Sequence, residues 1–359
     1  MPSFDFIRQS KPEKTFRVAS VIGKFDLPGN HIKERFTGEI EFPEDWQIGL
    51  IVGASGTGKT VISKELFPES YVTHFQYSSD AVINDMPESA TVEQITKAFN
   101  SVGFSSPPSW LKPYSVLSGG QKMRVDLANA MLREGKMFVF DEFTSVVDRQ
   151  VAKIGSFAMQ KAIRRTKKKF IAVSCHSDVE QWLLPDWVFE TNTMTFRKTD
   201  GQKKNRPGVE FEIYRTPNKG IWKMFCKHHY LSSEHNNAAA VYVAMINDSI
   251  AGFLSVLHFP HPIVKNMKKV HRLVILPDYQ GLGFGVLFLN QVAKLYSDFR
   301  FSIVTSSPSL VFALKKHSEW RCLRFGRVKS QSKGTTVGNM NTSQQRITVS
   351  FEYIGTKHE

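Results

Sequence analysis

The chain has 359 residues, of which 41% are hydrophobic and 22% charged, a composition typical of a packed protein and too apolar for a disordered one. Its formal net charge of +14 favours a polyanionic partner such as nucleic acid (DNA or RNA), with a merely basic solvated surface as the alternative. The sequence has no apolar run of about 18 residues and no secretion signal at its start, so we expect a cytoplasmic protein without membrane contact.

The first half of the chain alternates short apolar runs with helical patterns. Strand-like alternation occurs in FRVASVIGKFDL and RFTGEIEF, and three short apolar runs indicate buried strands: WQIGLIVGAS, KMFVFDEF and KKFIAVSCH. Helical periodicity occurs over 60–66, 91–102, 119–133 and 151–168. This alternation predicts an α/β fold, with a mostly parallel sheet flanked by helices.

A basic stretch with glycine and proline, FRKTDGQKKNRPG, predicts a linker over 197–208. It would separate one domain over 1–196 from a second over 209–359. In the second domain we expect strands in VEFEIYR, KKVHRLVIL, FSIVTSS and RITVSFEYIG, a hairpin turned at Asn247-Asp248, and a helix in FGVLFLNQVAKLYSDF. Residues 329–345 are rich in small polar residues and predict a loop.

A glycine-rich stretch of the first domain matches G-x-x-x-x-G-K-[ST] between a predicted buried strand and a predicted helix. The glycines let backbone N–H groups approach phosphates, and the helix amino end adds a partial positive charge. Lys59 would reach the terminal phosphates of ATP, and the Thr60 hydroxyl would ligate Mg²⁺. A glycine turn with a chance lysine is the alternative. The predicted site contains Gly53, Ser55, Gly56, Thr57, Gly58, Lys59 and Thr60.

Two carboxylates, Asp141 and Glu142, follow a second buried strand, where ligands bind in open α/β sheets. We expect Asp141 to hold Mg²⁺ and Glu142 to orient or deprotonate the attacking water. Two acidic residues at a solvated strand end are the alternative, which the neighbouring phosphate loop disfavours.

Three further motifs accompany the phosphate loop and the Asp141-Glu142 pair: Leu117-Ser118-Gly119-Gly120-Gln121, the SVVD run that ends at Asp148, and His176. In content and order, these five motifs resemble an ATP-binding-cassette (ABC) ATPase over residues 1 to about 200. The resemblance implies that the segment from Ser118 to Gln121 contacts the γ-phosphate bound to a partner chain. It also implies that Asp148 belongs to the ATP site and that His176 contacts the same phosphate. Since each motif occurs once, the resemblance implies a homodimer closed by ATP.

Three further points bear on this resemblance. Gln76 is the candidate for the glutamine that reaches the metal, and Phe25 is the candidate for stacking on adenine, with core packing as its alternative. The segment between Thr60 and Leu117 is short for a transporter member, which counts against a pump.

A second glycine-rich turn, Gln280-Gly281-Leu282-Gly283-Phe284-Gly285, joins a predicted strand to a predicted helix. This arrangement resembles the pyrophosphate loop of the GNAT N-acetyltransferases, and the element order over residues 209 to about 325 agrees with it. The resemblance implies a GNAT-like α+β domain in which the loop binds the pyrophosphate of acetyl-CoA or another acyl-CoA. Val274, Ile275 and Leu276 would then present main-chain groups to the pantetheine arm. A glycine turn required only for close packing is the alternative.

Residues for acyl transfer are less clearly marked. His229, Glu234 and His258 are candidates, because a histidine or glutamate can deprotonate an amine acceptor, and each has a structural or solvated role as its alternative. GNAT enzymes often place a tyrosine acid in the helix after FSIVTSS, where this chain has Phe312 and no tyrosine.

Basic residues gather in two runs that suit phosphate contact, the second with aromatic residues that suit base stacking. A solvated face is the alternative. The first run is Arg164, Arg165, Lys167, Lys168 and Lys169, and the second is Lys315, Lys316, Arg321, Arg324, Arg327, Lys329 and Lys333, interleaved with Trp320 and Phe325.

An ABC ATPase joined to a GNAT domain resembles a set of bacterial and phage fusion proteins. We expect an ATP-hydrolysing dimer whose GNAT half acylates, or otherwise modifies, a nucleobase amine. One alternative is an ATP-switched binding module without transfer chemistry. The other is an ATPase subunit of a membrane transporter.

Overall fold

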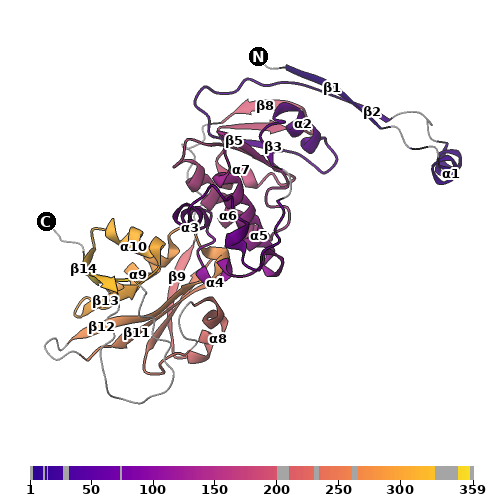
Figure 1. Cartoon of the computed structure of the whole chain (residues 1–359). Coiled ribbons are helices and arrows are strands. Elements are labelled where there is room, and N and C mark those ends of the chain that lie inside the picture. The colour runs from indigo at the N-terminus through magenta and orange to yellow at the C-terminus, as the bar shows by residue number, and fades with distance from the viewer. Residues whose placement is uncertain are drawn as a thin grey trace. The chain divides into compact units, whose positions relative to one another are not determined.

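The computed structural model describes residues 3–10, 13, 15–26, 32–72, 75–199, 210–229, 234–260, 266–327 and 347–355. The chain forms two compact units (Figure 1). The first contains Met1–Phe75 and Arg133–Pro207, and the second contains Gln76–Leu132 and Gly208–Glu359. The predicted linker beyond residue 199 and the predicted loop over 329–345 lie outside the described residues, and so do Lys329 and Lys333.

The first unit is built on a six-stranded sheet with the order β4-β5-β6-β3-β7-β8. All neighbouring strands are parallel except the last pair. The predicted mostly parallel sheet is therefore confirmed, and its central strand β3 is buried along its length, as its continuous apolar sequence requires. The strands are β3 (Ile48–Val52), β4 (Tyr71–Val72), β5 (Met137–Phe140), β6 (Lys169–Ser174), β7 (Trp187–Glu190) and β8 (Thr195–Lys198).

Helices α2 (Lys59–Leu66), α6 (Arg149–Ile163) and α7 (Val179–Leu183) complete this unit. Helix α6 ends before the predicted limit at Lys168. Just after it, Arg164 forms an ion pair with Asp186 at 2.7 Å, and the carbonyl of Thr166 accepts a hydrogen bond from Gln47. These contacts hold the chain out of helical register as it enters β6.

An antiparallel pair, β1 (Ser3–Ser10) and β2 (Ile32–Glu39), also belongs to the first unit. The predicted strand in FRVASVIGKFDL is wrong, because Phe16–Phe25 forms helix α1. Thr15 caps this helix by accepting a hydrogen bond from Val18 N. The apolar residues recur at helical spacing as well as in partial alternation, and the cap decides between the two.

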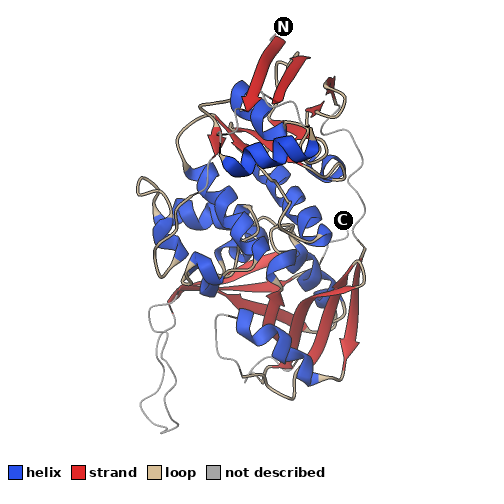
Figure 2. Ribbon diagram, turned by 90° about the vertical axis from the view of Figure 1, so that its right-hand side faces the viewer, coloured by secondary structure: helices blue, strands red, loops and turns tan. Residues whose placement is uncertain are grey.

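The second unit contains a seven-stranded sheet with the order β14-β15-β13-β12-β11-β10-β9. Figure 2 shows these strands side by side as one twisted layer. The predicted hairpin is confirmed: β10 and β11 are joined by Asn247 and Asp248, whose φ angles are +44° and +62°. The strands are β9 (Phe211–Thr216), β10 (Ala240–Ile246), β11 (Ser249–His258), β12 (Met267–Ile275), β13 (Arg300–Thr305), β14 (Trp320–Arg327) and β15 (Ile347–Tyr353).

Helices α9 (Phe284–Lys294) and α10 (Pro308–Lys315) cover one face of this sheet, and α8 (Trp222–Phe225) covers the other (Figure 1). Helix α9 stops short of the predicted end at Phe299, because Tyr296 turns inward and its ring stacks on Phe301. The same unit contains α3 (Val92–Ser101), α4 (Pro107–Trp110) and α5 (Gly119–Leu132). None of the helices among the described residues is both long and apolar enough to cross a membrane.

Candidate active sites

The predicted ATP loop lies between β3 and α2. It turns at Gly56 and Gly58, whose φ angles of +84° and +85° lie in the left-handed region that favours glycine. Gly58 is the N-cap of α2, so the first-turn N–H groups of that helix have no partner within the helix and can bind a ligand held by the loop. Lys59 Nζ donates a hydrogen bond to Ala54 O at 2.6 Å, which places the ammonium over the loop.

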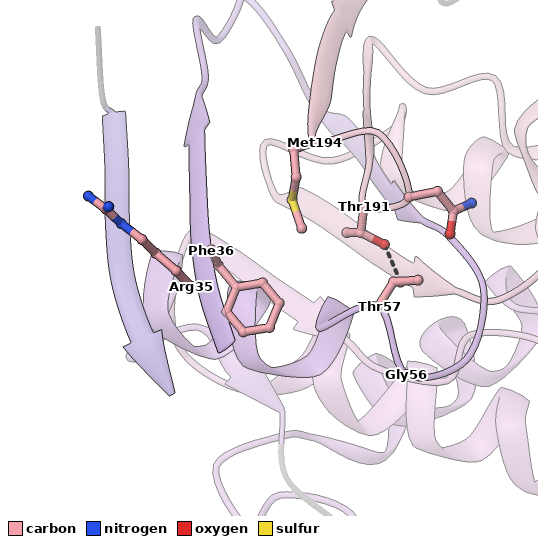
Figure 3. Close-up of a pocket in the computed structure, with 7 residues that line it drawn as sticks. Arg35, Phe36, Gly56, Thr57, Thr191 and Met194 are labelled. Atoms are coloured by element: carbon pink, nitrogen blue, oxygen red, sulfur yellow. Dashed lines mark hydrogen bonds between the residues drawn. The ribbon is translucent and has the colours of Figure 1, made fainter. Parts of the chain in front are cut away.

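A pocket of about 420 Å³ opens beside this loop. Phe36 and Met194 give it an apolar wall, and Thr191 Oγ1 lies 2.5 Å from Thr57 Oγ1 at its floor (Figure 3). Phe25 is 63% exposed on α1, so its alternative role as a core residue is wrong, and its role as the adenine partner stays a prediction. Phe36, which sequence reasoning missed, is the aromatic residue of this pocket. The pocket is lined by Arg35, Phe36, Gly56, Thr57, Thr191, Asn192 and Met194.

Asp141, at the carboxyl end of β5, lies next to the phosphate loop. Its Oδ2 accepts a hydrogen bond from Thr60 Oγ1 at 2.7 Å and another from the Tyr71 hydroxyl. Burial, reinforced by this carboxylate, raises the pKa of Tyr71, which therefore stays a donor. We predicted that Thr60 and Asp141 are Mg²⁺ ligands, and the structure places Thr60 Oγ1 next to Asp141 Oδ2.

No group of three or more His, Cys, Asp and Glu side chains is placed to hold a metal within the described parts of the chain. A hard cation at Thr60 and Asp141 would therefore take its remaining ligands from phosphate oxygens and water, as Mg²⁺ usually does. Gln76 is exposed beyond β4, and its predicted role at the metal stays a prediction.

Glu142 has a φ angle of +52°, which is uncommon for a residue other than glycine and is characteristic of functional sites. Its backbone N–H donates to Asp141 Oδ1 at 2.8 Å, and its side chain is exposed. His176 follows the parallel strand β6 and is half-buried. Asp148 accepts a hydrogen bond from Val151 N as the N-cap of α6, so it has a structural contact beside its predicted role at ATP.

The segment from Ser118 to Gln121 starts helix α5. Ser118 Oγ accepts from Gln121 N at 3.3 Å, while Gln121 Oε1 accepts from Ser118 N at 3.1 Å. This reciprocal capping leaves Ser118 and Gly119 exposed at a helix amino end, a position that favours anions. The arrangement fits the predicted contact with a phosphate carried by another chain.

The second glycine-rich loop lies between β12 and α9, directly after a short 3-10 helix, η6 (Pro277–Tyr279). Gly281 and Gly283 have φ angles of +96° and +91°, and Gly283 is the N-cap of α9. A Cβ atom on Gly283 would meet nothing within 4 Å. The open side of this turn, and the first-turn N–H groups of Phe284 and Gly285, are therefore available to a ligand.

Strands β12 and β13 separate beside this loop. Their parallel register covers only Met267 to Lys269 on β12 and Arg300 to Ser302 on β13. Beyond that point β13 continues to pair with β15, and β12 pairs only with β11. The edge of β12 at Ile275 is thus not paired with β13, and the carbonyl of Ile275 accepts a hydrogen bond from Gln280 Nε2 at 2.8 Å.

A pair of histidines that sequence reasoning missed lies on the same strand. His271 is the extra residue of a β-bulge, because Ser255 and Val256 of β11 pair with Arg272 and Val270. The centroids of the His271 and His235 rings are 5.5 Å apart. His271 Nε2 accepts a hydrogen bond from Asn236 N at 3.3 Å, and neither ring nitrogen of His235 has a hydrogen-bond partner among the described residues.

Two of the three predicted acyl-transfer residues lie near this histidine pair. Glu234 precedes His235 in the chain and is exposed. His229 contacts the ring of Trp222, which His235 also contacts. His258 is exposed at the end of β11, opposite Lys268. These three roles stay predictions.

The protein-family comparisons match part of each half of the chain. The ABC transporter family model matches residues 63–145, and the acetyltransferase (GNAT) family model matches residues 210–308. One chain carries an ABC ATPase domain and a GNAT domain. The predicted α/β fold with these two domain types is confirmed.

Similar proteins match only parts of the chain. An ABC transporter of Fusarium pseudograminearum is 32% identical over 100 residues, which are 28% of this chain and 8% of that protein. The sn-glycerol-3-phosphate import ATP-binding protein UgpC 1 of Rhizobium johnstonii is 26% identical over 205 residues, 47% of this chain and 52% of the relative. The solved structure of cbiO1 from Clostridium perfringens, part of an ABC transporter complex, is 20% identical and covers 42% of this chain and 76% of its own, with a TM-score of 0.34. The chain thus spans about half or less of these first two relatives.

The histidine pair of the GNAT domain is held in its neutral form. Burial, with smaller contributions from Arg272 and His235, lowers the pKa of His271 to about 4. Burial also lowers the pKa of His235, where Lys219 and Arg272 add to the effect. A neutral imidazole has one nitrogen that can accept a proton, and in His271 that nitrogen is Nε2, which accepts a hydrogen bond from Asn236 N.

The lowered pKa of His271 predicts a pH-dependent stability. The unfolded chain takes up the proton below about pH 6.5 and the folded chain only near pH 4. Stability from this residue is therefore complete above pH 6.5 and is lost as the pH falls toward 4. Because the ring is partly exposed, we expect His271→Gln to recover only about 1 kcal/mol of that loss. Urea unfolding at pH 7 and pH 4.5 measures it, and identical losses in variant and wild type would contradict the assignment.

The second basic run forms an exposed patch on the GNAT domain. Phe312 on α10 and Phe325 on the edge strand β14 are 61% and 65% exposed. Lys316 Nζ lies 4.2 Å from the centre of the Phe312 ring, and Lys315 Nζ lies 5.9 Å from that of Phe325. We call Phe312, Lys315, Lys316 and Phe325 the basic aromatic patch.

One expectation about the second basic run is corrected. Trp320 is buried and donates to Asn290, so it is not available for base stacking. In the first run, Arg164 pairs with Asp186, Lys168 donates to the carbonyl of Arg133, and Lys169 lies over the Trp46 ring. The charges of that run therefore serve the packing of the first unit as well as its surface.

Proposed function

We propose that two copies of this chain close on ATP, and that the GNAT domain transfers an acyl group from acyl-CoA to an amine of nucleic acid. One observation supports both halves of the proposal. The chain contains two phosphate cradles built alike, each with a strand, a left-handed glycine as N-cap and a helix: Gly58 at φ +85° and ψ +7°, and Gly283 at φ +91° and ψ +9°.

At the first cradle, the residues of this chain would bind and position the nucleotide. Lys59 and the α2 amino end would bind the phosphates, while Thr60 and Asp141 would hold the Mg²⁺ that neutralises them. Glu142 would orient and deprotonate the attacking water, and His176 would contact the γ-phosphate. Ser118 and Gly119 of the second chain would complete the site, which makes the proposed enzyme a homodimer.

At the second cradle, the loop from Gly281 to Gly285 would bind the CoA pyrophosphate, and the edge of β12 that is not paired with β13 would bind the pantetheine arm. The acceptor amine nitrogen would then attack the thioester carbonyl carbon and form the new C–N bond as the C–S bond breaks. The amine proton would pass to His271 Nε2 in place of the Asn236 N–H, and from there to the departing CoA thiolate.

The proposed acceptor is a nucleic-acid amine, because the basic aromatic patch combines the two features that bind single-stranded nucleic acid, positive charge and exposed aromatic rings. Its lysines can contact phosphates and its exposed rings can stack on bases. The net charge of +14 supports the same class of partner.

Nucleoside mass spectrometry tests this proposal. DNA and RNA from cells that express the intact protein should contain a new, heavier nucleoside, absent from cells that express Glu142→Gln or Gly283→Trp. Protein abundance is measured in each sample as the control. Unchanged nucleosides at equal abundance would contradict a nucleic-acid acceptor, and ATP hydrolysis without loss of acyl-CoA in vitro would favour an ATP-switched binding module.

A second candidate function rests on the names of the relatives. One is an import ATP-binding protein and another is an ABC transporter. In that case this chain would be an ATPase subunit that pairs with a membrane protein. Co-purification of a tagged chain from detergent-solubilised cells with an integral membrane protein would support this candidate, and its absence from such eluates would exclude it.

A further inference from the structure

Arg124 on helix α5 contacts the turn before the second glycine-rich loop, residues 280–285, which we call the acyl-CoA loop. Both elements belong to the second unit. The Arg124 side chain is fully buried. Its Nη2 donates to Asp278 O at 2.8 Å, and its Nη1 donates to Pro277 O. Burial lowers its pKa to about 10, so the guanidinium is still charged at neutral pH. A buried charge is tolerated only when it is bonded. Here Nη1 and Nη2 bond the backbone carbonyls of η6, directly before the loop, while Nε has no hydrogen-bond partner among the described residues.

A second contact joins the same two regions. Gln280, the first residue of the loop, donates from Nε2 to Ile275 O at 2.8 Å and accepts from Ser105 N at 2.9 Å. Gly103 has a φ angle of +86°, and a Cβ atom there would lie 2.5 Å from Gln280 O. The backbone at Gly103 thus lies directly against the first residue of the acyl-CoA loop.

The other end of α5 carries the segment proposed to contact the γ-phosphate of a second chain. Ser118 and Arg124 are six positions apart, about 9 Å along a helix. Two residues beyond Arg124, Asp126 accepts hydrogen bonds from Tyr77 at 2.6 Å and Tyr114 at 2.8 Å. The rings of these tyrosines stack with their centroids 3.9 Å apart. Helix α5 is therefore a braced element with a phosphate contact at one end and the η6 carbonyls on its side.

We propose that Arg124 is a positioning residue through which ATP occupancy raises the affinity of the GNAT domain for acyl-CoA. This inference rests on the proposed function of both cradles. When ATP fixes Ser118 in the closed dimer, the braced helix α5 transmits that constraint to Arg124, which holds the turn at Pro277 and Asp278 in the shape that the loop needs. The loop then loses less conformational entropy when acyl-CoA binds. By linkage, acyl-CoA raises the affinity for ATP by the same factor.

The test measures CoA binding to the full-length Glu142→Gln protein by calorimetry, with and without MgATP. Glu142→Gln is the background because it should bind ATP without consuming it. We expect MgATP to lower the Kd of CoA about tenfold, within the usual range of coupling between two sites. In Arg124→Lys, which keeps the charge but not the two-pronged contact, and in Arg124→Met, the ratio of the two Kd values should fall toward one.

Gly103→Ala provides a second variant that leaves Arg124 in place, and it should lower the same ratio by displacing the backbone of Gln280. Lys97→Met is the matched control, since it removes an exposed charge from α3 of the same unit and should keep the tenfold ratio. A role in folding alone would change both Kd values together and leave their ratio intact.

The outcomes separate this inference from the proposed function. Binding of both ligands with a ratio of one in the parent protein would overturn the coupling and leave both sites standing. A tenfold ratio that survives in the Arg124 and Gly103 variants would overturn the route through this contact. No CoA binding in either condition would overturn the proposed acyl-CoA site, and the coupling with it.

Discussion

Glu142→Gln is expected to abolish ATP hydrolysis while leaving ATP binding intact. The residue follows Asp141 at the carboxyl end of β5, and its carboxylate is exposed and proposed to orient and deprotonate the attacking water. A glutamine has the same shape but cannot accept the proton, and loss of a general base slows a reaction about 100-fold or more. Because hydrolysis reopens the proposed dimer, the variant should accumulate as a dimer in MgATP. Phosphate release and light scattering after gel filtration measure the two effects.

The control is Glu134→Gln, which removes an exposed carboxylate from the same unit outside the site. It should hydrolyse ATP at the wild-type rate. Normal hydrolysis by Glu142→Gln would overturn the role given to this residue. A slow variant that stays monomeric in ATP would retain that role and contradict the ATP-closed dimer.

Gly283→Trp should have the second large effect, a loss of CoA affinity of at least about 100-fold, equal to roughly 2.7 kcal/mol. The space beyond the missing Cβ is open within 4 Å, so an indole there would occupy the volume assigned to the pyrophosphate. The φ angle of +91° adds strain for any residue with a side chain. Calorimetry with CoA measures the loss, and ATPase activity should stay at the wild-type level.

Gly326→Trp is the matched control, because a Cβ atom at Gly326 also meets nothing within 4 Å, on a strand of the same unit away from the loop. It should bind CoA normally. Unchanged CoA affinity in Gly283→Trp would show that the cradle is misplaced. Weak binding in both variants would point to general damage to the GNAT domain.

The two phosphate loops could be predicted because their chemistry is local in sequence. A strand, a glycine turn and a helix lie within a few consecutive residues around Gly58 and again around Gly283, so the pattern contains the geometry. The same is true of the hairpin at Asn247 and Asp248, where the turn residues determine the backbone.

The residues that sequence reasoning missed are assembled from distant segments. His271 meets His235 only because a bulge in β12 turns an extra residue toward it, and register shifts of that kind leave no signal in a single sequence. Phe36 could have been found, since it is an aromatic residue in a strand-like run before the phosphate loop. The error at Phe16–Phe25 arose because a short apolar segment fits both periods until its cap is considered.

The second unit is discontinuous in the chain, and this has a consequence for its synthesis. Arg124 leaves the ribosome 153 residues before its carbonyl partner in Pro277. At ordinary translation speeds that interval lasts roughly 8 to 30 s. During this time the segment Gln76–Leu132 has no partner from Gly208–Glu359, and its apolar residues are open to chaperones and to aggregation. Expressing 209–359 alone would remove the same partner permanently, so a truncated GNAT domain starts with the η6 carbonyls unpaired.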